Sequence, residues 1–124
     1  MTRKRINKYE GDYKDGKRHG KGTCAYHNGD WYKGDWKNDK RHGIGTVIWS
    51  NRTRYEGEWK DDKADGIGTV TFVSGSKYIG EFKNGSRHGK GINYDKSGSI
   101  YDGEYVNAKR EGYGIHTYAH GSYK

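Results

Sequence analysis

Aromatic and charged residues alternate along short stretches of the chain. In the first stretch, Tyr9, Gly11 and Tyr13 occupy every second position, and Glu10 and Asp12 lie between them. Successive residues of a strand point to opposite faces of a sheet. This period of two therefore predicts a strand with one aromatic face and one charged face.

A returning strand follows each such stretch. The segment DGKRHG supplies a turn, and Gly20, Gly22, Cys24 and Tyr26 then place small residues and one aromatic ring on a single face. The next segment, HNGD, turns the chain again. Each unit is therefore predicted to be a β-hairpin.

The unit recurs every 23 residues without drift, which indicates a repeat architecture in which each unit packs on its neighbour. We predict an all-β fold, a linear array of five 23-residue β-hairpin repeats that form an elongated single-layer antiparallel sheet. A basic lead at residues 1–8 precedes repeats 9–31, 32–54, 55–77, 78–100 and 101–124. At about 4.8 Å per strand, roughly ten strands would span about 50 Å.

Composition indicates how such a sheet could form a core. Only 29% of the 124 residues are hydrophobic and leucine is absent, yet 15% are aromatic and 21 are glycine. A ring can lie flat on a single-layer sheet only where the neighbouring strand carries no side chain. We therefore predict a core of aromatic rings packed over glycine Cα atoms.

The repeated unit resembles the MORN (membrane occupation and recognition nexus) repeat, whose pattern looks like YxGxW…GKRHGxGxxxxxxG. The segment YEGDYKDGKRHGKGTCAYHNGD matches this pattern almost position by position, and the resemblance extends from residue 9 to about residue 122. It implies an elongated, slightly curved sheet of hairpins. It does not imply one activity, because such arrays occur in junctional membrane proteins, plant lipid kinases, ciliary spokes and parasite cytoskeletons.

The candidate reactive side chains do not form a catalytic or metal-binding pattern. His19, His42 and His88 recur at one repeat position, so successive copies lie two strands or roughly 10 Å apart, too far to share one metal ion. Cys24 is interpreted as a small buried thiol. The sequence therefore favours a non-enzymatic protein without a metal or cofactor.

The basic residues could form a second kind of site. The formal net charge is +8, and part of the excess recurs at the turns. A basic edge with a spacing of about 10 Å could contact anionic phospholipid head groups. Alternatively, these charges keep a narrow sheet soluble. Nucleic acid is disfavoured, because the rings are committed to packing on glycine. The predicted basic edge consists of Lys17, Arg18, Lys40, Arg41, Lys63, Arg87, Lys109 and Arg110.

The leading functional hypothesis is a scaffold that binds a partner protein, as a peptide or helix, along a partly open aromatic and glycine groove. The predicted groove residues are Tyr9, Tyr13, Tyr32, Trp36, Tyr55, Trp59, Tyr78, Phe82, Tyr101 and Tyr105. The alternatives are a peripheral membrane module that uses the basic edge, and the targeting array of a larger enzyme. The single cysteine and the absence of an apolar leader in MTRKRINKYEG predict a cytoplasmic protein. Association with the cytoskeleton or a membrane is what the MORN resemblance implies.

Three departures from the repeat pattern are also evident. Ala64 and Asp65 replace the Arg-His pair of the first two repeats, Asp95 replaces an aromatic residue, and Arg52 replaces a turn glycine. These positions distinguish individual repeats from one another.

The two outer strands of a linear array have unpaired edges, which invite further pairing. Basic residues before Tyr9 would discourage contact at the first edge. We therefore expect any homodimer to form through the C-terminal repeats with two-fold symmetry. Light scattering at several concentrations would detect it, and a chain ending at Ser99 should lose it.

Overall fold

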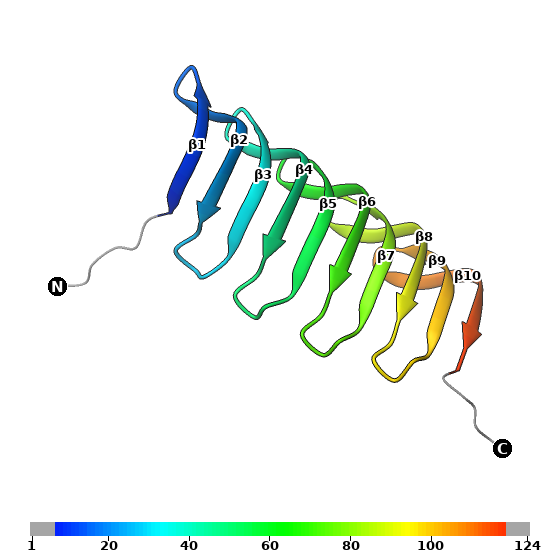
Figure 1. The fold of residues 1–124 in the computed structure, drawn as a ribbon. Helices are drawn as coiled ribbons and strands as arrows, with labels where there is room; N and C mark the ends of the chain where they lie inside the picture. Colours follow the sequence, from blue (N-terminus) through cyan, green and yellow to red (C-terminus); the bar gives the residue numbers. More distant parts are fainter. Residues whose placement is uncertain (1–6, 119–124) are drawn as a thin grey trace.

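The computed structural model describes residues 7–118, which form ten strands and no helix. Every strand pairs antiparallel with the next strand along the chain, so one sheet runs in order from the first strand to the last (Figure 1). The all-β hairpin array predicted from the sequence is confirmed. The strands are β1 (Lys8–Lys14), β2 (Lys17–Ala25), β3 (Trp31–Lys37), β4 (Lys40–Ile48), β5 (Arg54–Lys60), β6 (Lys63–Thr71), β7 (Lys77–Lys83), β8 (Ser86–Tyr94), β9 (Ile100–Val106) and β10 (Lys109–Thr117).

Each hairpin closes with a turn of two residues. Asp15 and Gly16 join β1 to β2 with φ of 52° and 77°, and Asn38 and Asp39 join β3 to β4 with φ of 50° and 70°. Two consecutive positive φ values match the twist of the flanking strands, and Asn, Asp and Gly adopt them at the smallest cost. The longer turn predicted over DGKRHG is wrong, because its KRH segment belongs to β2.

A bulge bends each hairpin near its turn. Gly11 pairs with Gly22, whereas Tyr13 pairs with Arg18, so the second strand contains extra residues over this interval. One of them, Gly20, adopts a φ of 75°. Bulges bend and twist a strand, and the turn ends of the hairpins accordingly curve away from the plane of the remaining sheet (Figure 1).

The opening tyrosine of each repeat lies over a glycine of the next strand. A Cβ atom added to Gly45 would overlap the ring of Tyr32, and one added to Gly68 would overlap the ring of Tyr55. The Tyr32 hydroxyl also donates a 2.8 Å hydrogen bond to the Asp35 carbonyl. The predicted packing of rings over glycine is therefore confirmed.

The rings of neighbouring repeats form one continuous row of edge-to-face contacts, with centroid separations from 5.1 to 5.8 Å. This geometry is favourable because the positive edge of one ring meets the negative face of the next. Burial raises the pKa of Tyr78 to about 12. The row runs through Tyr9, Trp36, Tyr32, Trp59, Tyr55, Phe82, Tyr78, Tyr105 and Tyr101.

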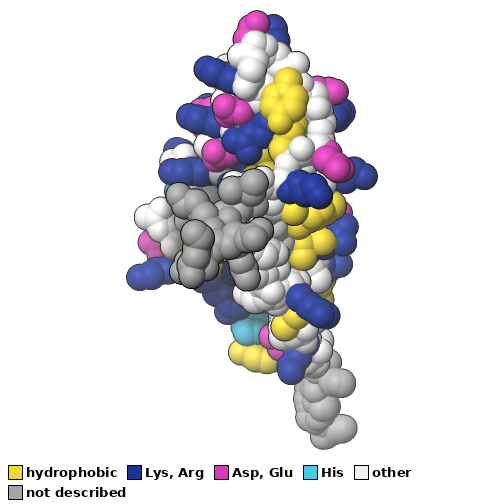
Figure 2. Space-filling model, turned by 90° about the vertical axis from the view of Figure 1, so that its left-hand side faces the viewer, with side chains coloured by type: hydrophobic (Ala, Val, Ile, Leu, Met, Phe, Trp, Pro, Cys, Tyr) yellow, Lys and Arg dark blue, Asp and Glu magenta, His cyan; other side chains and the backbone are white. Residues whose placement is uncertain are grey.

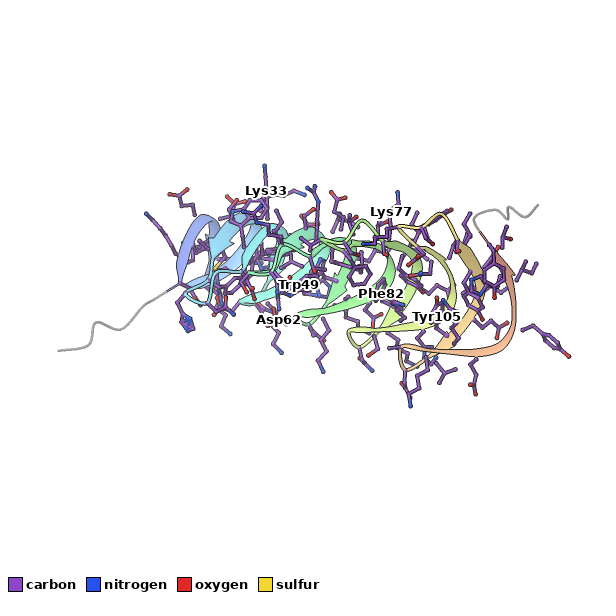
Figure 3. All side chains as sticks on the ribbon, turned by 90° about the horizontal axis from the view of Figure 1, so that it is seen from below. Lys33, Trp49, Asp62, Lys77, Phe82 and Tyr105 are labelled. Atoms are coloured by element: carbon purple, nitrogen blue, oxygen red, sulfur yellow. The ribbon has the colours of Figure 1, made fainter. Side chains whose placement is uncertain are left out.

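The ring row occupies the inner side of the curved sheet. Figure 3 shows Phe82 and Tyr105 inside the curve of the ribbon, together with Trp49, whereas Lys33 points outward. The core therefore lies on one face only, which we call the concave face.

Parts of the predicted organisation lie outside the described residues. These are the basic lead, apart from Asn7 and Lys8, and residues 119–124 of the fifth repeat. Across residues 7–118, no helix has the length and apolarity needed to cross a membrane.

Gly57→Val tests the close packing of the core. A Cβ atom at this position would lie 2.5 Å from both the Gly68 Cα and the Ile67 carbonyl oxygen, so the backbones must separate. We expect the free energy of unfolding to fall by about 1 to 3 kcal/mol or more in chemical denaturation. The exposed control Lys60→Ala should change it by no more than about 0.5 kcal/mol. Equal stabilities of the two variants would contradict this packing.

Candidate functional site

The ten predicted groove residues all lie on the first strand of a hairpin, which is β1, β3, β5, β7 or β9. Most of them are buried. Tyr9 is half-buried and Tyr13 is exposed, whereas the other eight rings are at most 8% exposed. These eight rings are committed to the core and present little surface to a partner. Tyr26, Trp49 and Phe72, which pack on the core while remaining partly exposed, provide additional ring surface on the concave face.

Ion pairs between successive hairpins cover part of the ring row. The Arg18 Nε lies 3.0 Å from Asp39 Oδ1, and the same oxygen accepts a 2.8 Å hydrogen bond from the Arg18 backbone N–H. In return, the Asp39 backbone N–H donates to the Arg18 carbonyl over 3.0 Å. Arg41 and Asp62 repeat this arrangement one unit later, with a 3.1 Å separation. We call these contacts the inter-repeat ion pairs.

Each of these ion pairs also rests on an aromatic ring. The Arg18 guanidinium carbon lies 4.6 Å from the centroid of Trp36, and that of Arg41 lies 4.6 Å from the centroid of Trp59. Hydrogen bonds from the Arg18 backbone N–H and, to a smaller extent, from its guanidinium hold the pKa of the Asp39 carboxyl below its usual value. In each case the arginine therefore links the second strand of its hairpin to the turn of the following hairpin, and it also covers a ring of the core.

The ion pair is incomplete in the third and fourth units. At the third position, Ala64 and Gly85 replace the arginine and the aspartate, although the Gly85 N–H still donates to the Ala64 carbonyl over 2.8 Å. At the fourth position, Arg87 is present, but the turn residue is Ala108, whose N–H donates to the Arg87 carbonyl over 2.9 Å. Among residues 7–118, no carboxylate forms an ion pair with Arg87.

A hollow of about 310 Å³ opens on the concave face where the ion pairs are incomplete. Trp49 and Phe72 belong to its wall, and Ala64, Arg87 and Ala108 also line it. Three of the predicted groove residues, Tyr55, Trp59 and Phe82, also line this space.

The eight residues of the predicted basic edge lie on two faces. The four arginines, Arg18, Arg41, Arg87 and Arg110, stack on concave-face rings, with 4.1 Å between the Arg110 guanidinium carbon and the Tyr101 centroid. The four lysines, Lys17, Lys40, Lys63 and Lys109, are exposed at the preceding positions and so point to the opposite face. The eight residues therefore do not form the single row that the sequence predicts, and basic and acidic side chains are interspersed in Figure 2.

Lysines on the outer face do form a row of their own. Because the turns contain only two residues, the lysine before each turn pairs directly with the lysine after it in the first three hairpins. Like charges placed opposite each other destabilise a sheet, so the repetition of these pairs is not explained by stability. The lysine row consists of Lys14 with Lys17, Lys37 with Lys40, and Lys60 with Lys63.

Candidate metal ligands do not converge in the part of the chain that the structure describes. Residues 7–118 contain no group of three or more His, Cys, Asp or Glu side chains that could hold a metal ion. Cys24 is fully buried in the ring core, opposite Tyr32.

Comparison with protein-family models identifies the repeated unit. The MORN-repeat model matches residues 9–31, 32–54, 55–77, 78–99 and 101–123. The chain belongs to the MORN-repeat family. MORN repeats are non-catalytic modules that generally take part in protein or membrane association. No match is found among curated proteins.

Several concave-face and outer-face residues of this MORN array were not among the predicted site residues. Trp49 and Phe72 occupy one repeat position, and Ala64 is a departure from the repeat pattern, so these two signals together could have indicated the hollow. Lys14, Lys37 and Lys60 are the members of the lysine row that the predicted basic edge lacks. A two-residue turn places the lysine before the turn directly opposite the lysine after it, so the turn length determines these pairs.

The last strand of the described sheet has an exposed edge. Every residue of β10 is exposed, and Tyr113 is 95% and Ile115 70% exposed. The expected homodimer through the C-terminal repeats stays a prediction.

Asp39→Asn tests the inter-repeat ion pair. We expect a melting temperature a few degrees lower at neutral pH, because the amide cannot form the charge-assisted bond to Arg18. A carboxyl with a lowered folded-state pKa stabilises the fold above its unfolded-state pKa and loses this effect as pH falls through the folded-state value. The melting difference between wild type and variant should therefore shrink below about pH 4. The exposed control Glu10→Gln should show little difference from wild type, and an Asp39→Asn effect independent of pH would exclude this account.

Proposed function

We propose that this MORN array is a scaffold that binds a segment of a partner protein on its concave face. The observation that supports this proposal is the hollow at the third repeat, where Ala64 replaces the arginine that covers the rings of the preceding repeat, so that Trp49 in its apolar wall has no arginine from residues 7–118 over it. Ligand sites in proteins are concave and mostly apolar, with a few polar groups that fix orientation. Arg87 would be such a polar group.

The geometry of the array favours an elongated ligand. The hollow is one position along a continuous concave face, and the partly exposed ring of Tyr26 extends this face toward the N-terminal repeats. A peptide or a helix that lies along the array would contact several repeats at once. Such a scaffold would act in the cytoplasm, with its partner determining any association with the cytoskeleton. The same surface would serve if the array were the targeting part of a larger enzyme.

Peptide selection tests this proposal. Phage that display random twelve-residue peptides would be selected on the immobilised full chain, and the selected peptides would be synthesised for affinity measurement. We expect saturable binding that is lost in Ala64→Arg with Gly85→Asp, a double variant that restores the third ion pair and fills the hollow. Gly85 already has a φ of 86° and no atom within 4 Å of an added Cβ, and Asp39 adopts a similar conformation, so this variant should fold.

The outer-face variant Ile44→Ala is the matched control for peptide selection, because Ile44 is a 59% exposed apolar side chain away from the concave face. Its affinity for the peptides should equal that of the wild type. Failure to select any peptide would exclude the scaffold proposal, as would peptides that bind the filled double variant with undiminished affinity.

A second candidate function is the binding of anionic membranes, favoured by the lysine row on the outer face. Neutralisation by anionic head groups would relieve repulsion within its like-charged pairs, and each lysine near such a surface contributes about 1 kcal/mol. This surface is opposite the concave face, so both functions could operate in one molecule.

Vesicle sedimentation distinguishes a specific lysine row from net positive charge. With vesicles that contain phosphatidic acid, we expect weaker binding after Lys14, Lys37 and Lys60 are all changed to Gln. The matched control changes the exposed lysines Lys33, Lys90 and Lys96 to Gln, which removes the same charge elsewhere. Equal sedimentation of the two triple variants would refute a role for the row.

A further inference from the structure

The hollow occupies the place that an arginine fills in other repeats. The Arg41 guanidinium carbon lies 4.6 Å from the centroid of Trp59 and 5.8 Å from those of Tyr26 and Tyr32. In the next repeat, 23 residues later, the position equivalent to Arg41 is occupied by Ala64.

The three rings that correspond to this arginine site are present in the third repeat. They are Trp49, Tyr55 and Phe82, and all three line the hollow beside Ala64. A side chain supplied by another molecule could therefore cover these rings as Arg41 covers the rings of the preceding repeat.

In the fourth repeat the arginine is present but the carboxylate that would pair with it is missing. The guanidinium of Arg87 lies 4.7 Å from the centroid of Tyr78 and 5.6 Å from that of Phe72, but Ala108 has no carboxylate to pair with it. In the first repeat, the equivalent carboxylate of Asp39 accepts hydrogen bonds from both the backbone N–H and the Nε of Arg18. The fourth repeat thus presents a partly buried guanidinium and a backbone N–H without that acceptor.

We infer that the hollow and Arg87 together recognise an acidic segment of the partner protein, in which a large apolar side chain and an Asp or Glu carboxylate lie roughly 10 Å apart. This distance is the spacing of two strands, because Ala64 and Arg87 occupy equivalent positions in successive repeats. In an extended segment, it corresponds to residues about three positions apart. The inference rests on the proposed scaffold function and specifies the chemistry of the partner.

The charge in the wall of the hollow favours an apolar ligand over a basic one. Its lining contains Arg87 but no Asp or Glu, so a lysine or arginine that entered would meet a like charge and no carboxylate in the wall. A buried charge without a partner is costly, whereas apolar side chains gain by leaving water. A carboxylate from the partner would supply the counter-ion that Arg87 lacks.

Ala108→Asp provides a direct test, because it returns the missing carboxylate to the array itself. Ala108 has a φ of 70°, and Asp39 and Asp62 adopt φ values of 70° and 71° at the equivalent turn positions, so the aspartate fits this backbone. Ala108→Asn has nearly the same shape without the charge and is the matched control. Circular dichroism would verify that both full-length variants are folded.

The peptides selected on the wild-type chain would be measured against both variants by isothermal titration calorimetry. We expect an acidic residue about three positions from a large apolar residue to be enriched among them, and about tenfold weaker affinity for Ala108→Asp than for Ala108→Asn. Exchange of the acidic residue in a peptide for its amide should weaken binding to the wild type by a similar factor but should have little effect with Ala108→Asp.

The outcomes separate this inference from the proposed function. Peptides that require the open hollow but show no acidic preference, or that bind both Ala108 variants equally, would overturn the inference and leave the scaffold function intact. Selection of no peptide would overturn both.

Discussion

The packing of a tyrosine ring on a backbone without a side chain is the constraint on which the structure depends. A single-layer sheet has no second layer to cover its apolar side, so the rings of Tyr32 and Tyr55 lie down on Gly45 and Gly68 of the adjacent strands. Glycine at these positions is required by contact distance, since any Cβ atom would overlap the ring. The edge-to-face contacts between repeats then join these local units into one core.

The two faces of the sheet acquire different roles from this one-sided core. On the concave side, Arg18 and Arg41 cover the rings and connect a hairpin to the turn of the next one. The ion pairs therefore hold successive hairpins together. On the outer side, the lysines adjacent to the turns are exposed and contribute no comparable packing. Binding to a protein segment and binding to an anionic surface are therefore proposed for opposite faces.

Much of the fold could be predicted because the residues that recur in every repeat are the residues that pack against each other. Tyrosine and glycine recur in register, and a period of two places them on one face, which predicts the sheet and its core without knowledge of distant contacts. The predicted turn is too long, because Lys17 and Arg18 beside the turn residues Asp15 and Gly16 belong to a strand. Their placement in β2 decides which face each basic side chain occupies.

The candidate site was less predictable because it depends on differences between repeats and on contacts across them. Asp39 pairs with Arg18, a residue of the preceding hairpin, and this relation is visible only when the turn is placed against the strand. The hollow arises from the small side chain of Ala64, so its location follows from what the equivalent residue Arg41 covers. A repeat pattern alone identifies such a departure but not the space it opens.

The most direct measurement of the central claim is the chemical shift of the glycine Hα protons in solution. Protons of Gly45, Gly68 and Gly91 should resonate upfield, because each lies beneath the ring of an opening tyrosine. Gly16 and Gly85, which have no atom within 4 Å of an added Cβ, are the internal reference and should show no such shift. Chemical shifts of the first group that match those of Gly16 and Gly85 would contradict the account of a core built from rings on glycine.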